Sequence, residues 1–148
     1  MQLKRMAAVV VAVAALLACS GGNRIDEDQA VAQAVRVAEG WLELVDNQNY
    51  ADSWEATAEI FKKDGDIQMW RNNIENTHAQ YGRCQSRTLR EALYKSRLPG
   101  ADMGQYVVIQ YDSVFERKAD VRETVTLKLE ADGRWPVVGY ILRASRTD

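Results

Sequence analysis

Few residues of this chain could take part in chemistry, and they do not form a catalytic pattern. His78 is the single histidine, and it lies between Thr77 and Ala79 in a stretch with helical spacing. A metal site or an activated nucleophile needs several such groups at a defined spacing. We therefore expect no metal, no cofactor and no catalytic residue. His78 is interpreted as solvated or locally bonded, and Cys84 as a half-buried structural thiol.

Two short segments resemble parts of functional sites, but neither completes the pattern. Asp64-Gly65-Asp66 is too short for a calcium loop, whose ligands extend over about twelve positions. Gly21-Gly22 lacks the lysine of a phosphate-binding loop and the strand before it. No serine lies in a nucleophile-elbow sequence.

Cys19 is the residue with the best-defined chemistry. The basic pair Lys4-Arg5 precedes an apolar run over residues 6–18, which suits a signal peptide and is shorter than the roughly 20 residues of a membrane span. Residues 16–19 (LLAC) resemble the bacterial lipobox, in which the cysteine thiol receives a diacylglycerol before cleavage ahead of it. We expect residues 1–18 to be a lipoprotein signal peptide and Cys19 to be lipidated. An uncleaved signal anchor, or secretion with a cut elsewhere, is the alternative.

Lipidation implies a location. Several acyl chains anchor a protein stably, whereas one chain holds it only marginally. Ser20 occupies the position where an aspartate would resemble the inner-membrane retention signal, so we expect the cell outer membrane, with the domain facing the periplasm. Residues 19–29 then form the lipidated cysteine and a short tether. With Cys19 acylated, Cys84 has no cysteine partner, and no disulfide is expected.

Length and charge limit the remaining possibilities. The chain has 148 residues, which is enough for one domain, placed at residues 30–145. Its formal net charge is −2, without the basic excess that nucleic-acid binding normally requires. We therefore expect no nucleic-acid partner.

The first part of the domain has helical periodicity. One apolar stripe extends from residue 31 to residue 45, polar residues 46–49 interrupt it, and Tyr50 and Trp54 resume a short helix. A further apolar patch follows at residues 58–61. Another helix is predicted from about Asp66, its cap, to Gln80, with Gly82 as its stop. Gly40 interrupts the stripe and suggests a close approach by another element. The stripe consists of Val31, Ala34, Val35, Ala38, Trp41, Leu42 and Val45.

Beyond Gly82 the pattern alternates with a period of two. Strands are predicted at residues 85–97, 105–116, 121–130 and 135–143. The third carries Val121, Val125, Leu127 and Leu129 on one face. Helices followed by strands predict an α+β domain, with N-terminal helices packed on a curved, cone-like antiparallel sheet of about four strands.

Several of these segments resemble one bacterial protein family. They are Trp41 with Asp46 and residues 50–54, Phe61-Lys62, Ser86-Arg87, residues 98–100, 123–126 and 133–140. The family is catalogued as domain of unknown function number four thousand and nineteen, and the resemblance extends from about residue 30 to residue 143. The family has no assigned activity, so the resemblance implies no catalytic residues. A looser similarity to the nuclear-transport-factor-two-like cone concerns the fold alone.

Large aromatic residues are the candidates for a ligand pocket. They could equally form the core, and the core is the simpler interpretation. The sequence predicts a lipid-anchored envelope protein with a non-catalytic domain that binds a small molecule or an envelope protein partner. The alternative is a cone-fold enzyme, an isomerase or dehydratase with a buried carboxylate. The candidate pocket residues are Trp41, Tyr50, Trp54, Arg87, Tyr94 and Tyr140.

Overall fold

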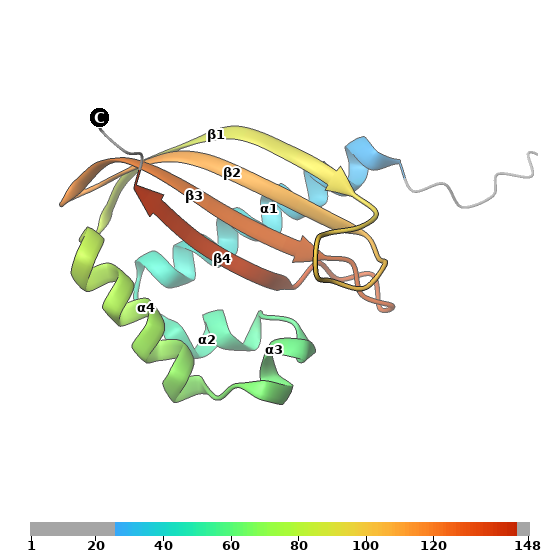
Figure 1. Cartoon of the computed structure of the whole chain (residues 1–148), viewed down its shortest axis with the longest axis horizontal. Coiled ribbons are helices and arrows are strands. Elements are labelled where there is room, and N and C mark those ends of the chain that lie inside the picture. The colour runs from blue at the N-terminus through green and yellow to red at the C-terminus, as the bar shows by residue number, and fades with distance from the viewer. Residues whose placement is uncertain (1–25, 145–148) are drawn as a thin grey trace, which may run out of the picture.

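The computed structural model describes residues 26–144, in which helices precede a single antiparallel sheet (Figure 1). Helix α1 (Glu27–Asp46) packs against the sheet, and α2 (Tyr50–Glu55), α3 (Glu59–Asp64) and α4 (Ile67–Tyr81) follow on the same side. The predicted α+β class is confirmed. The predicted signal peptide, Cys19 and residues 20–25 of the predicted tether lie outside the described residues. Residues 26–29, predicted as tether, are the cap and the first turn of α1.

The four strands pair in chain order and leave the sheet open. Strands β1 (Cys84–Lys95), β2 (Tyr106–Phe115), β3 (Lys118–Lys128) and β4 (Val137–Ala144) are all antiparallel to their neighbours. β1 and β4 are the edges, and the sheet does not close on itself. β3 begins three residues earlier than predicted, because a tight turn brings Lys118 directly opposite Phe115.

Helix α1 is stabilised by a capping residue at its start and by an apolar face along its length. The Asp26 carboxylate accepts hydrogen bonds from the backbone N–H groups of Asp28 (3.1 Å) and Gln29 (3.4 Å), which the first turn leaves without helical partners. The predicted stripe faces the sheet, and its members from Ala34 to Val45 include the most deeply buried residues of the helix. The space between α1 and the sheet is therefore filled by side chains.

Two tryptophans of the helical layer share one serine. Trp41 Nε1 donates to the Ser53 carbonyl (3.0 Å), and Trp70 Nε1 donates to Ser53 Oγ (3.0 Å). Ser53 Oγ itself donates to the Tyr50 carbonyl (2.9 Å). The two indole rings lie 5.8 Å apart between centroids. This arrangement ties α1, α2 and α4 together and satisfies indole N–H groups that burial would otherwise leave unpaired.

The segment predicted as one short helix and an apolar patch contains two helices. The chain leaves the helical conformation around Thr57, which forms a parallel bridge with Val137 of β4. The Ala58 N–H donates to the Val137 carbonyl (2.9 Å), and α3 begins at the next residue. The pairing with β4 therefore separates α2 from α3.

The expectation that another element approaches Gly40 closely is wrong. Gly40 lies on the exposed side of α1, and a Cβ atom added there meets nothing within 4 Å. Gly82 is different, because its φ is +78° and an added Cβ would lie 2.7 Å from the Glu116 Cβ. Gly82 ends α4, as predicted.

Substitution of these two glycines by alanine should change the free energy of unfolding in opposite directions. Gly40→Ala removes backbone freedom from the unfolded chain at a site with free space, so it should raise the free energy of unfolding by about 0.5–1 kcal/mol. Gly82→Ala should lower it, because a side chain is strained at that φ and clashes with Glu116. Urea unfolding followed by circular dichroism measures both. An equal effect of the two substitutions would contradict this interpretation.

Candidate functional site

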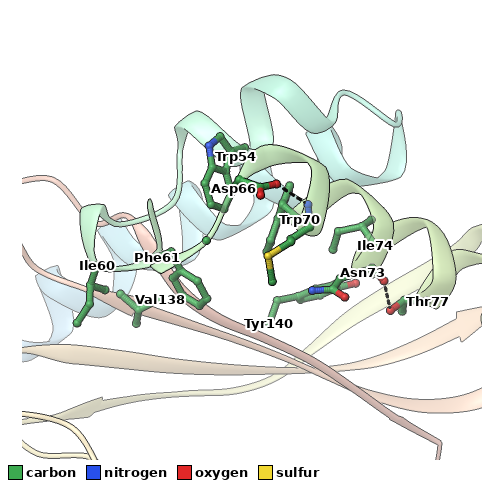
Figure 2. Close-up of a pocket in the computed structure, with 12 residues that line it drawn as sticks. Trp54, Ile60, Phe61, Asp66, Trp70, Asn73, Ile74, Thr77, Val138 and Tyr140 are labelled. Atoms are coloured by element: carbon green, nitrogen blue, oxygen red, sulfur yellow. Dashed lines mark hydrogen bonds between the residues drawn. The ribbon is translucent and has the colours of Figure 1, made fainter. Parts of the chain in front are cut away.

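A cleft of about 610 Å³ lies between α3, α4 and β4 (Figure 2). Helix α4 packs mainly against α2, and a space remains between α4 and the edge strand β4. The lining residues are four aromatic, four aliphatic, one glycine and three polar: Trp54, Phe61, Trp70 and Tyr140; Ile60, Met69, Ile74 and Val138; Gly65; Asp66, Asn73 and Thr77.

Three large apolar side chains of this cleft are exposed to solvent. Ile60 is 59% exposed, Met69 56% and Phe61 36%. Ile60 and Phe61 come from α3, and Met69 comes from the first turn of α4. Single exposed apolar residues are common, whereas a group of them around a concavity is typical of a binding surface.

The polar groups of the cleft are few, and two of them have structural partners. Asp66 caps α4, since its Oδ1 accepts from the backbone N–H groups of Gln68 (2.8 Å) and Met69 (2.9 Å). Thr77 Oγ1 donates to the Asn73 carbonyl (2.8 Å). Within the described residues, the Asn73 carboxamide has no hydrogen-bond partner.

A buried ionic network lies behind the cleft wall, centred on Glu123 of β3. Its side chain is 0% exposed. Arg87 of β1 donates to it through Nε and through a second nitrogen (3.1 Å), Ser113 Oγ donates at 2.9 Å, and Tyr140 Oη donates at 2.7 Å. Arg87 also forms a bidentate pair with Asp46, the last residue of α1, at 2.9 and 3.2 Å.

The network satisfies its own hydrogen-bonding capacity. A carboxylate has about four lone-pair positions, and Glu123 receives four donors. Burial lowers the pKa of Arg87, but its hydrogen bonds to Glu123 and Asp46 outweigh that effect and raise the pKa above the ordinary value. The guanidinium therefore stays charged between two carboxylates. Glu123 has no lone pair left to accept a proton from a molecule in the cleft.

Tyr140 connects the network to the cleft. Its ring lines the cleft and contacts Trp41 edge to face, with centroids 5.1 Å apart, while its hydroxyl reaches Glu123. Burial raises the pKa of Tyr140, and the charge and hydrogen bond of Glu123 raise it further. The phenol therefore stays neutral, and Glu123 fixes the position of an aromatic ring in the cleft wall.

His78 and Cys84 lie near this network without joining its hydrogen bonds. His78 Nε2 is buried and has no partner in the described residues, so the interpretation of His78 as solvated or locally bonded is wrong for this atom. Burial lowers the pKa of His78. Burial raises the pKa of the Cys84 thiol to about 11. Reactive cysteines require a lowered pKa, so this environment favours an inert thiol.

A second, more open groove of about 480 Å³ lies between α1 and the turn that joins β3 to β4. Trp135 lines it together with two arginines, Arg36 and Arg134. Trp135 Nε1 donates a hydrogen bond to Gln33 Oε1 (3.4 Å), and Arg134 forms an ion pair with Asp132 in the turn. This groove has fewer aromatic residues than the cleft.

The six candidate pocket residues divide among three environments. Trp54 and Tyr140 line the cleft. Arg87 belongs to the ionic network. Trp41 and Tyr50 are core residues, and Tyr94 is half-buried against that core. The simpler interpretation of the aromatics therefore holds for Trp41 and Tyr50.

Sequence reasoning missed Glu123, although the sequence contains a signal for it. Glu123 falls in register with Val121 and Val125, so a strand that alternates correctly must direct a carboxylate to its buried face. A buried carboxylate requires donors. Ser113 lies in the neighbouring strand β2, on the same face of the sheet as Glu123. It continues the alternating buried positions that apolar residues occupy earlier in β2.

Removal of the Glu123 charge should destabilise the domain. Glu123→Gln leaves Arg87 beside an amide in a buried site, and disruption of one member of a buried ion pair costs about 3–5 kcal/mol. Asp112→Asn is the matched control, because Asp112 pairs with Arg90 and Arg122 on the exposed face, where such pairs contribute about 0–1 kcal/mol. Urea unfolding measures both. Equal losses would show that the buried network does not stabilise the fold as we describe.

No helix within residues 26–144 is long and apolar enough to cross a membrane.

Comparison with known proteins agrees with the resemblance found in the sequence. No curated protein matches the chain. The model of one family, described as a protein of unknown function (DUF4019), matches residues 37–140, a range that includes the cleft and every member of the ionic network. The chain belongs to the DUF4019 family, as its sequence motifs predict.

Proposed function

We propose that this protein is a lipid-anchored envelope protein whose folded domain binds a small lipophilic molecule in the cleft between α3, α4 and β4. The observation that carries the proposal is the composition of that cleft. Eight of its twelve lining residues are aromatic or aliphatic, and three of these are exposed to solvent. Ligand sites are typically concave and apolar, with a few polar groups for orientation.

The size of the cleft favours a small molecule over a protein segment. Its volume of about 610 Å³ falls within the range of roughly 300–1,000 Å³ that is common for small-molecule sites. A protein partner would more commonly bury a flat patch of about 800 Å² on each side. Capture of an envelope protein by the same residues is the other outcome that a binding test can give.

Binding is favoured over the isomerase or dehydratase alternative by the state of the buried carboxylate. Such an enzyme requires a carboxylate or histidine that can exchange a proton with its substrate. Glu123 is buried, but its lone pairs are occupied by Arg87, Ser113 and Tyr140. Asp66, the carboxylate of the cleft itself, caps α4 through one oxygen and is exposed to solvent, whereas such an enzyme requires a carboxylate inside a closed pocket.

A matched pair of methionines tests the cleft. Met69 and Met103 are both exposed, at 56% and 72%, but only Met69 lines the cleft. Met69→Asp should weaken binding of the neutral fluorescent probe N-phenyl-1-naphthylamine by about ten-fold or more, because it places a charge in an apolar site. Met103→Asp should leave binding unchanged. The measurement is a fluorescence titration of the domain that starts at Ser20, which retains every described helix and strand.

Equal effects of the two substitutions would mean that the probe binds elsewhere. Absence of probe binding, together with absence of any thermal shift from pooled metabolites, would overturn the small-molecule proposal. Retention of a specific envelope protein by Met103→Asp but not by Met69→Asp would favour the protein-binding version.

The membrane anchor is proposed from the sequence alone. The lipobox-like residues 16–19 support acylation of Cys19, and Ser20 supports sorting to the outer membrane, with the cleft in the periplasm. A lipophilic ligand would be available at such a location. The short tether keeps the domain close to the membrane surface.

Cysteine substitution tests the anchor. Cys19→Ala should abolish metabolic labelling with a fatty acid and, because cleavage follows acylation, should leave residues 1–18 attached. Cys84→Ala is the matched control and should retain both labelling and cleavage, since Cys84 lies in the folded domain. Labelling that persists in Cys19→Ala would contradict the lipoprotein interpretation.

A further inference from the structure

We infer that the cleft prefers a lipophilic organic cation, an amine or quaternary ammonium group on an apolar body. This inference rests on the proposed binding function and adds the sign of the ligand's charge. It follows from three features of the cleft: its one ionisable acid, its aromatic walls and the absence of basic residues from its lining.

Asp66 supplies the negative charge. Its Oδ1 accepts both capping hydrogen bonds, whereas its Oδ2 has no partner within the described residues. The positive end of the α4 dipole is equivalent to about half a charge, so it offsets the carboxylate only in part. The free oxygen at the edge of the cleft is therefore available to a cation.

Aromatic rings stand next to this carboxylate. Trp70 lies one turn along α4 from Asp66. Gly65, the residue before Asp66, lies against the Trp54 ring, since a Cβ added to Gly65 would be 3.4 Å from that ring. The Trp54 and Trp70 centroids are 6.1 Å apart, and Figure 2 shows both rings on the same side of the cleft as Asp66. Cations bind favourably over aromatic faces, most strongly over tryptophan.

No basic residue opposes a cation there. The twelve lining residues include no lysine, arginine or histidine. Lys62 of α3, which follows the lining residue Phe61 in the chain, pairs with Glu55 and Glu59. Arg87 is held between Asp46 and Glu123 behind the wall. An anionic ligand would therefore find no counter-charge in the cleft and would meet the Asp66 carboxylate.

Three probes with one apolar body and different charges test the inference. They are 4-phenylbutylammonium, 4-phenylbutanol and 4-phenylbutanoate, titrated calorimetrically into the domain that starts at Ser20. We expect the ammonium compound to bind about five- to thirty-fold more tightly than the alcohol, and the carboxylate to bind most weakly. Added salt should weaken binding of the ammonium compound and leave binding of the alcohol nearly unchanged.

The substitution Asp66→Asn tests whether Asp66 causes the preference for the ammonium compound. Asparagine caps helices about as well as aspartate, so the variant should keep the fold, which its melting curve checks. It should lose most of the preference for the ammonium compound over the alcohol and keep only the part that the tryptophan rings supply. Glu91→Gln, which removes an exposed charge from β1 at the opposite edge of the sheet, should keep the wild-type preference.

The outcomes separate this inference from the proposed function. Equal binding of all three probes, tightest binding of the carboxylate, or an unchanged preference in Asp66→Asn would overturn the inference and leave the cleft as a binding site. Absence of binding by all three probes and by N-phenyl-1-naphthylamine would overturn the proposed function as well.

Discussion

Glu123 is completely removed from water, and four hydrogen bonds from Arg87, Ser113 and Tyr140 replace its hydration. Burial of a charge in this way costs several kcal/mol unless the partners are placed accurately. The partners come from β1, β2 and β4, and Arg87 extends the network to Asp46 at the end of α1. The network can therefore form only when the helix and all four strands have reached their final positions, which makes it a constraint on the whole fold.

The same network determines what the cleft can be. It holds Arg87 behind the wall, so that no guanidinium lines the cleft, and it fixes the neutral phenol of Tyr140 as part of the wall. The apolar residues of α3 and α4 complete the cleft on the other side. Charge is thus concentrated in the buried network, while the cleft keeps an apolar surface with Asp66 as its one ionisable acid. This separation of charge from the cleft is the physical basis for proposing a lipophilic ligand.

Local periodicity accounts for the parts of the fold that could be predicted from the sequence. The stripe of α1, the cap at Asp66, the stop at Gly82 and the alternation of β3 depend on neighbouring residues, and each was predicted. The network could not be predicted as a unit, because Asp46, Arg87 and Glu123 meet only through the pairing of distant strands. The cleft depends on the way α4 stands away from β4, which no local pattern encodes. The sequence indicated its α3 residues only as an apolar patch.

The tryptophan side chains offer the most direct test of the central claim that the cleft between α3, α4 and β4 is the ligand site. Their indole N–H signals can be followed separately by nuclear magnetic resonance during a titration with 4-phenylbutylammonium. We predict that the signals of Trp54 and Trp70, which line the cleft, shift in a saturable way, while the signal of Trp135 in the second groove stays unchanged. Shifts confined to Trp135, or no saturable shift at Trp54 and Trp70, would contradict the account.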